Sequence, residues 1–354
     1  MDFSLSEERK MLQETVARFF ENSYNDIKKR SEYLDMNDGF SREFWKESSN
    51  LGVISGLISP NFGGLGGSGE DISIIFELIG KSLCIEPFLS SGLLSSTILS
   101  SIKNPKTELI NQIIDGQLLV SFAHMEMNNR YEDHFVESKA FFENENWKLN
   151  GSKSFVINGD SADKVIISAR IEGKINDKNG IGLFLVDSNK INNRSYNTID
   201  GYRSAELNFD NVNAELLCKD ELALECIIKA NSAGALALSA EAVGIMQVCF
   251  DLTLDYLKTR KQFGKSIGSF QSIQHRMVDM MLEIEQVRSA VMLASSTFET
   301  NSSTRDKNIS AAKNLVGRVG KLIAEESIQL HGGIAMTWEY SVAHYAKRLI
   351  MIDH

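Results

Sequence analysis

The pattern of apolar and polar positions divides the chain into three zones. In residues 1–116, apolar residues such as Leu12, Val16 and Phe19 recur at helical spacing. Residues 117–214 carry short apolar runs, such as "KVIISA" and "GLFLV", separated by Asn, Asp and Gly, which is typical of buried strands. From about residue 215 the helical pattern returns. We therefore expect a mainly α, α+β fold with an N-terminal helical domain (1–116), a small antiparallel β domain (117–214) and a C-terminal four-helix bundle (215–354).

Two local patterns make this expectation more specific. The segment "WKLNGSKSFVINGD" predicts two strands joined through Asn150-Gly151, because Asn-Gly is a preferred dipeptide of two-residue hairpin turns. In the third zone, apolar residues recur at alternating steps of four and three, which predicts a helix packed nearly antiparallel to its neighbours. These residues are Ile273, Met277, Met280, Ile284, Val287 and Val291. No proline follows Pro105, so long uninterrupted helices are permitted.

Composition and charge narrow the class of protein. The chain is 43% hydrophobic and 24% charged, as in ordinary globular proteins, which excludes general disorder. The formal net charge is −10, so the chain lacks the excess of positive charge that is typical of nucleic-acid-binding proteins, and we expect no nucleic-acid partner. The four cysteines lie far apart and form no CxxC, so we expect neither a disulfide framework nor a zinc site, and a reducing cytoplasm fits. They are Cys84, Cys218, Cys226 and Cys249.

The termini and apolar segments also predict a cytoplasmic protein. The sequence opens with "MDFSLSEERK", which is acidic and polar and therefore unlike a secretory signal. The most apolar window, Ala233 to Val248, contains Ser239, Glu241 and Gln247, and we interpret it as too short and too polar to span a bilayer.

One group of glycines has the spacing of a nucleotide-binding motif. Gly64, Gly66 and Gly69 match the dinucleotide fingerprint GxGxxG. That fingerprint requires a preceding strand and an acidic residue about 20 positions further on. The glycines instead lie in a helical zone without such an acid, so we interpret them as a surface turn.

Two turn regions are candidates for holding phosphate. In "RKQFGKSIGSFQ" (260–271), Arg260 near a turn could bind phosphate with both arms of its guanidinium. The alternative is that basic residues are simply favoured at a helix C-terminus. In Gln329–Gly333, two glycines after an apolar helix predict a tight turn whose outward amides could accept phosphate. There the alternative is an ordinary helix C-cap.

Glu241 is the candidate for proton transfer. It lies in "ALALSAEAVGIM", where its sequence neighbours are apolar. Burying a carboxylate is costly because the charge loses its hydration, and an acid held in such surroundings is a candidate general base. The alternative is that Glu241 points to solvent or pairs with a Lys or Arg.

Taken together, these features resemble the acyl-CoA dehydrogenase family over nearly the whole chain. Two motifs carry most of the resemblance, "YLKTRKQFGKSIGSFQSIQHRMVDM" (256–280) and "QLHGGIAMTWEY" (329–340). The segments "LISPNFGGLGG" and "LNGSKSFVINGDSADKVIISAR" are similar to the family more loosely. The segment "HYAKRLIMID" resembles the small subunit of two-subunit bacterial enzymes such as pimeloyl-CoA dehydrogenase.

The resemblance implies an FAD-dependent oxidoreductase of lipid or acid catabolism. It implies FAD at a subunit interface, α,β-dehydrogenation of an acyl-CoA thioester with a carboxylate as base, and an electron-transferring flavoprotein as electron acceptor. By the same resemblance the FAD contacts are Arg260, Lys261, Gln262, Phe263, Phe270 and Gln271, the β-domain residues Phe155, Val156 and Ile157, and Gln329, Leu330, His331, Gly332 and Gly333.

Some positions depart from the family pattern. Met125-Glu126-Met127 stands where Thr-Glu-Pro is usual, and Ile157 replaces a hydroxyl residue. Many members carry the base about two residues beyond the position of His354, and another branch carries it at the position of Gly234. An acid at the Glu241 position is common in the two-subunit subtype, so we assign the base to Glu241.

These departures leave more than one hypothesis open. The first is a catalytic flavoprotein subunit that uses Glu241. The second is a non-catalytic structural subunit that completes the FAD and acyl-CoA site of a sister chain in a heteromer, such as a heterotetramer. A homo-oligomer and an oxygen-using oxidase are further alternatives.

Overall fold

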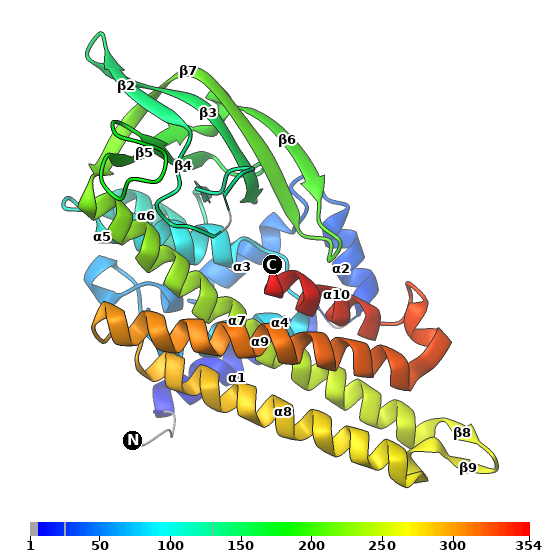
Figure 1. Ribbon diagram of the computed structural model, residues 1–354. Helices are drawn as coiled ribbons and strands as arrows, with labels where there is room; N and C mark the ends of the chain where they lie inside the picture. The colour runs from blue at the N-terminus through cyan, green and yellow to red at the C-terminus, as the bar shows by residue number, and fades with distance from the viewer. Residues whose placement is uncertain (1–5, 25, 130) are drawn as a thin grey trace. The chain divides into compact units, whose positions relative to one another are not determined.

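The computed structural model describes residues 6–24, 26–129 and 131–354. The chain divides into two compact units, which we name by their main elements. The helical unit comprises Met1–Asp35, Ser68–Ile85 and Ala235–His354, and the sheet unit comprises Met36–Gly67 and Glu86–Gly234. The order of elements along the chain is helices, then strands, then helices, which confirms the predicted fold class (Figure 1). The three-domain division stays a prediction.

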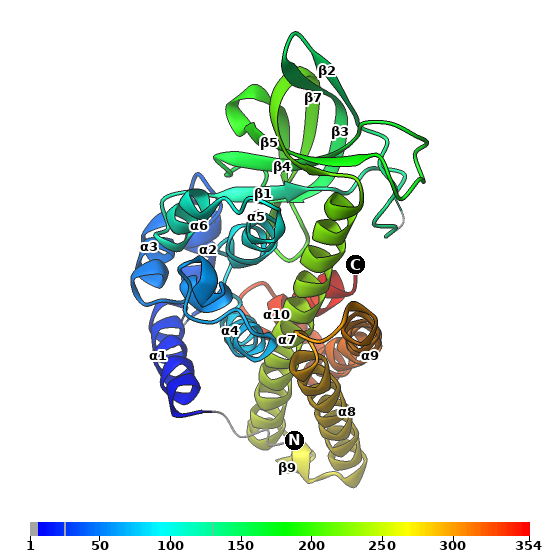
Figure 2. The same ribbon diagram turned by 90° about the vertical axis from the view of Figure 1, so that its left-hand side faces the viewer.

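The helical unit contains long helices and one small hairpin. Its elements are α1 (Glu7–Ser23), α2 (Ile27–Leu34), α4 (Gly69–Ser82), the larger part of α7 (Glu221–Thr259), β8 (Lys261–Gln262), β9 (Lys265–Ser266), α8 (Gln271–Ser296), α9 (Ser302–His331) and α10 (Val342–Asp353). The β8–β9 hairpin joins α7 to α8 at one end of the bundle (Figures 1 and 2). The short 3-10 turn η5 (Ile267–Ser269) precedes α8, and the 3-10 turn η6 (Gly332–Met336) follows α9.

Five of the six residues of the predicted seam on α8 are buried, namely Met277, Met280, Ile284, Val287 and Val291. Ile273, in the first turn of the helix, is only partly buried. The helix packs against α9 and α4. The steps of four and three place these side chains on one face, which explains why a single helix buries them all.

Helices α4 and α7 cross at very short range because each carries a glycine at the crossing. A Cβ built at Gly80 on α4 would collide with the backbone carbonyl of Glu241 on α7. A Cβ built at Gly244 on α7 would collide with the backbone carbonyl of Glu77 on α4. The two backbones therefore touch, and the crossing fixes the position of Glu241 along the bundle.

The sheet unit combines a closed sheet with short helices. Its helices are α3 (Arg42–Asn50), the 3-10 turns η1 (Ser55–Leu57) and η2 (Pro60–Phe62), the π-helix η3 (Phe88–Ser95), α5 (Ser96–Ser101), α6 (Thr107–Ile114) and the start of α7. Its strands are β1 (Val120–Ala123), β2 (Lys139–Glu143), β3 (Asn146–Ile157), β4 (Lys164–Arg170), β5 (Ile181–Asp187), β6 (Asn192–Asn197) and β7 (Arg203–Lys219). The runs "KVIISA" and "GLFLV" form β4 and β5, as predicted.

The sheet closes on itself because β5 pairs with both β7 and β4. The strand order is β1-β4-β2-β3-β7-β5, and β6 pairs with β7. Most pairings are antiparallel, as expected, but β1 pairs with β4 in parallel and β2 meets β4 in parallel at Lys139 and Arg170. Alternate side chains fill the interior, among them Leu149, Val165 and Phe184.

The prediction of a hairpin at Asn150-Gly151 is wrong. Both residues lie inside the continuous strand β3, at a register shift against β7. The turn between β2 and β3 is formed instead by Asn144 and Glu145, both in the left-handed region (φ 51° and 64°). Asn-Gly favours bulges as well as turns because glycine has no Cβ, and at Gly151 a Cβ would meet Ser138.

Gly64 and Gly66 lie in a turn between η2 and α4, and Gly69 is the first residue of α4. In the described residues no strand precedes them, but Gly64 and Gly69 are buried, so the turn is not the surface turn we expected. Ser68 caps α4 together with Asp71 in a capping box. The dinucleotide interpretation therefore lacks its strand–turn–helix context.

Helix α7 is long and apolar enough that length and composition alone would allow it to cross a membrane. However, 72% of its most apolar window is buried within the fold, which is typical of the core helix of a globular protein.

Candidate active site

Glu241 forms a buried ion pair with Arg348. Its Oε1 accepts a hydrogen bond of 2.6 Å from Arg348 Nε, and its Oε2 accepts one of 2.9 Å from Nη2. The side chains are 2% and 11% exposed. Arg348 lies on α10, so the pair ties α10 to the middle of α7. This fork-to-fork geometry is the strongest form of a carboxylate–guanidinium contact.

The expectation of a lone carboxylate among aliphatic neighbours is therefore wrong. Glu241 instead pairs with an arginine, which is the other interpretation that we considered for this residue. Its sequence neighbours are indeed apolar, but Arg348 lies 107 residues further on. Both oxygens accept a hydrogen bond from the guanidinium, and the carboxylate is almost fully buried.

Gly234, the position at which another branch of the family carries its base, faces leucines within the sheet unit. A Cβ built there would lie 2.9 Å from Cδ2 of Leu94 and 3.9 Å from Cδ1 of Leu89, both on the π-helix η3. The space beside this turn of α7 is thus occupied by aliphatic side chains.

The two phosphate-binding candidates of the helical unit lie near one end of the bundle. Tyr256, in the last turns of α7, stacks on His331 at the end of α9 with ring centroids 4.6 Å apart. Tyr340 meets the same imidazole edge-on at 5.0 Å. This aromatic contact brings the Arg260 segment and the Gln329–Gly333 turn to neighbouring positions. From Glu241 to Thr259, 18 residues of α7 span about 27 Å.

The hairpin at this end exposes its polar and aromatic side chains. Arg260, Lys261 and Gln262 are exposed, and Phe263 is 91% exposed at the tip, with φ 53°. Phe263 meets Phe270 edge-on at 6.3 Å, and the Lys265 ammonium lies 4.2 Å from the centre of the Phe270 ring. Gln271 begins α8 and is exposed.

The turn after α9 leaves open space at its glycines. Gly332 has φ 67° and ends α9, and a Cβ at Gly332 or Gly333 would meet no atom within 4 Å. Gln329 is exposed, whereas Leu330 and His331 are buried. The Gly332 amide already donates to the Ile328 carbonyl, so what this turn offers a phosphate-containing ligand is open space beside its two glycines.

The β-domain candidates lie in the sheet unit. Phe155, Val156 and Ile157 end β3, where the pairing with β7 shifts register. Phe155 has φ 52°, an uncommon value for a non-glycine residue. Val156 is buried, and Phe155 and Ile157 are partly exposed. The register shift re-aims these side chains within the strand.

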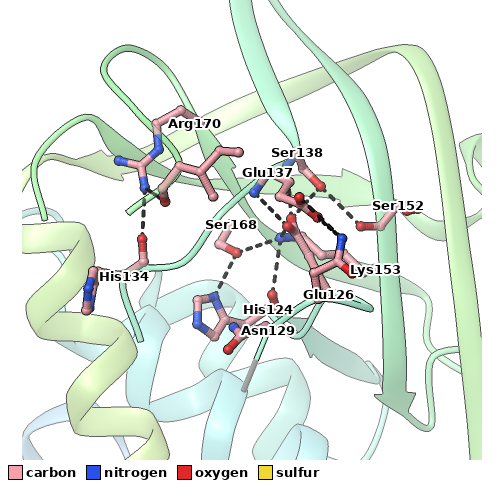
Figure 3. A network of polar contacts seen from close by, with 12 residues as sticks. His124, Glu126, Asn129, His134, Glu137, Ser138, Ser152, Lys153, Ser168 and Arg170 are labelled. Carbon is pink, nitrogen blue, oxygen red and sulfur yellow. Dashed lines mark hydrogen bonds and ion pairs between the residues drawn. The ribbon is translucent and has the colours of Figure 1, made fainter. Parts of the chain in front are cut away.

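Sequence reasoning missed a buried polar network in the sheet unit (Figure 3). Lys153 on β3 is fully buried and donates hydrogen bonds to Glu126 Oε1 (2.6 Å), Ser168 Oγ (3.0 Å) and the His124 carbonyl (3.2 Å). Glu126 also accepts from the Ser138 hydroxyl at 2.7 Å and from the Glu137 amide. A single lysine within the otherwise strand-like run "SKSFVI" was the available signal.

His124 contacts this network through one ring nitrogen. Ser168 Oγ accepts from Lys153 and lies 2.9 Å from His124 Nδ1. Burial, together with the nearby Lys153 charge, lowers the pKa of His124 to about 3. Burial alone would raise the pKa of Glu126, but the charge and hydrogen bonds of Lys153 and Ser138 hold it below its ordinary value.

Over 6–24, 26–129 and 131–354, no group of three or more His, Cys, Asp or Glu side chains is arranged to hold a metal ion. The four cysteines are free thiols.

Comparison with known proteins identifies the family. The acyl-CoA dehydrogenase N-terminal domain model matches residues 6–103, and the acyl-CoA dehydrogenase C-terminal domain model matches residues 224–351. A probable acyl-CoA dehydrogenase of Bacillus subtilis, YngJ, is 28% identical over 97% of this chain and 92% of its own length.

Solved structures share the fold. The ChsE4-ChsE5 complex from Mycobacterium tuberculosis matches with a TM-score of 0.88 and 19% identity, over 100% of this chain and 94% of that one. The FAD complex of PigA matches with a TM-score of 0.88 and 24% identity, over 99% and 94%. Because two models of one family cover the ends of the chain and the fold agrees throughout, this chain belongs to the acyl-CoA dehydrogenase family.

Proposed function

We propose that this chain is a subunit of a cytoplasmic, FAD-dependent acyl-CoA dehydrogenase that introduces an α,β double bond into an acyl-CoA thioester. The observation that carries the proposal is the match of both terminal regions to acyl-CoA dehydrogenase domain models. Electrons would pass to an electron-transferring flavoprotein. The FAD complex of PigA, which shares the fold, supports the choice of cofactor.

The end of the helical unit fits the phosphates of FAD. We assign pyrophosphate and adenine-side contacts to Arg260, Lys261 and Gln262, with Phe263, Phe270 and Gln271 beside them. The segment Gln329–Gly333 would contribute open space at its two glycines, since nothing lies within 4 Å of a Cβ at Gly332 or Gly333. Phe155, Val156 and Ile157 are the proposed contacts of the sheet unit. When bound, FAD supplies the acceptor for the hydride that leaves the substrate.

The position of Glu241 favours a second candidate function. In this candidate the chain is a structural subunit that completes the FAD and acyl-CoA site of a sister chain, which supplies the base. Glu241 commits both oxygens to Arg348, whereas a general base needs an oxygen within hydrogen-bond reach of the substrate proton. The related ChsE4-ChsE5 structure is a complex of two different proteins.

Co-purification of this chain with the product of its neighbouring gene separates the two candidates. We expect the complex to be yellow and to bleach with an acyl-CoA in the absence of oxygen. If Glu241 is the base, Glu241→Gln abolishes bleaching while FAD stays bound. If the chain is structural, Glu241→Gln bleaches like the wild type. A colourless complex would contradict the assignment of FAD.

Two matched variants identify the cause of any loss. Arg348→Gln breaks the same ion pair but keeps the carboxyl group, so it shows whether loss of the pair by itself abolishes bleaching. Glu225→Gln changes an exposed acid on α7 and serves as the neutral control. Loss of bleaching in Glu241→Gln with full bleaching in Arg348→Gln assigns the base to Glu241.

A further inference from the structure

Helix α8 carries a second row of apolar side chains, and this row is exposed. The helix runs along the outer edge of the helical unit and packs its buried seam against α9 and α4 (Figure 1). The apolar side chains that remain exposed on it are Val278, Met281, Leu282, Met292 and Leu293, each between 40% and 53% exposed. Single apolar residues on a surface are ordinary, whereas a group of them along one helix marks an interaction site.

The spacing of these residues is that of a second helix-packing seam. Val278, Leu282, Glu285, Ser289 and Met292 follow one another at alternating steps of four and three, and all five are exposed. This is the repeat by which helices pack side by side over several turns. From Val278 to Met292 the row is about 21 Å long, since each helical residue adds about 1.5 Å. We call these five residues the outer seam of α8.

The charges around the outer seam are balanced within the chain. The ion pairs that border it are Arg276–Glu326, Glu283–Arg318 and Arg288–Glu77. Arg288 also lies 3.6 Å from Glu285, the one acid within the seam. The seam therefore presents no strong charge of one sign that would select an oppositely charged partner, and an identical face can approach it without strong repulsion.

We propose that a second copy of this chain docks on the outer seam, with the two α8 helices antiparallel about a two-fold axis at the level of Val287. In such an interface each residue meets a different residue of the other copy. Leu282 of one copy then meets Met292 of the other, which buries both apolar ends of the seam. Glu285 meets Ser289 of the other copy, whose hydroxyl can donate to the carboxylate.

The same axis keeps the exposed acid beside the seam away from its own copy. Asp279 is exposed and lies eight residues from Val287. The two Asp279 side chains of a dimer are therefore about 24 Å apart along the helix axes. Charges at that separation are largely screened, because the screening length is about 8 Å at physiological ionic strength.

The inference does not rest on the proposed dehydrogenase activity. All residues of the outer seam lie in the helical unit, and none is among the proposed cofactor contacts. One helix pair of this length is a small interface, so we expect a dimer that dissociates on dilution.

Cysteine cross-linking of the full chain tests the geometry. Leu282→Cys with Met292→Cys in one chain should give a disulfide-linked dimer under mild oxidation, and so should a mixture of the two single variants. Leu282→Cys alone should give none, because its two copies lie about 15 Å apart along the helix axes, whereas a disulfide needs Cα atoms within about 7 Å. The wild type is the control, since its four cysteines are buried.

Light scattering at increasing protein concentration tests the interface without added cysteines. The wild type should pass from monomer to dimer, and Leu282→Glu should stay monomeric with an unchanged circular dichroism spectrum. Ile199→Glu, at an exposed apolar residue of the sheet unit, is the matched control and should dimerise like the wild type.

Three results would overturn the proposal. The first is a wild-type chain that is monomeric at every concentration, including one that cross-links at position 282 only to a different, homologous chain. The second is a dimer that survives Leu282→Glu. The third is a dimer of Leu282→Cys chains linked through position 282 on both copies, which requires parallel helices. None of these measurements needs FAD or an acyl-CoA, so their failure is independent of the proposed function.

Discussion

The ion pair between Glu241 and Arg348 gives the sharpest test of the structure. Arg348→Met would leave the Glu241 carboxylate buried without this guanidinium, and Glu241→Leu would leave the Arg348 guanidinium without its carboxylate. The double variant replaces both charges by apolar side chains. Together these variants form a double-mutant cycle, which isolates the energy of the pair from the rest of each side chain.

The expected magnitudes follow from burial. Because the side chains are only 2% and 11% exposed, water cannot replace a lost partner. Removing one member of a buried pair costs about 3–5 kcal/mol, whereas an apolar replacement of both is often neutral or stabilising. We therefore expect each single variant to be much less stable than the double variant.

Urea unfolding followed by circular dichroism measures these differences as midpoints and slopes. The more exposed pair Arg276–Glu326 between α8 and α9 is the control, with side chains 39% and 30% exposed. A pair of this kind contributes about 0.2–1 kcal/mol. The reasoning is refuted if the buried single variants cost no more than the exposed ones, or if their effects simply add in the double variant.

Two further predictions concern packing and pH. Gly80→Ala should destabilise the fold by about 1–3 kcal/mol, because its Cβ would collide with the Glu241 carbonyl, whereas Gly333→Ala, with nothing within 4 Å, should leave the melting temperature unchanged. The pKa of His124 is about 3 in the folded protein and 6.5 in the unfolded chain, so the unfolded chain binds a proton that the folded protein does not. The free energy of unfolding should therefore fall as pH drops below about 6.5. His124→Gln, whose amide oxygen could accept from Ser168, should reduce the dependence of the unfolding free energy on pH by up to about 1.4 kcal/mol per pH unit. An unchanged pH dependence in urea unfolding would contradict the lowered pKa of His124.

The sequence by itself determined the order of elements and the family. The seam from Met277 to Val291 is a local pattern, because residues three and four apart share a helix face wherever that helix packs. The runs that form β4 and β5 are equally local. The motifs at 256–280 and 329–340 identified the family directly from residue identities.

Only the tertiary structure decided how distant residues meet. Glu241 looked isolated because Arg348 is 107 positions away, and nothing in the spacing between them specifies a contact. Lys153 and Glu126 are likewise paired by the closure of the sheet around them. Asn150-Gly151 could form a turn or a bulge, and pairing of β3 with β7 on both sides selected the bulge. The periodicity of apolar residues within a segment predicts which face of a helix or strand is buried. The residues that meet across the core depend on how the helices and strands pack together, which no single segment of the sequence specifies.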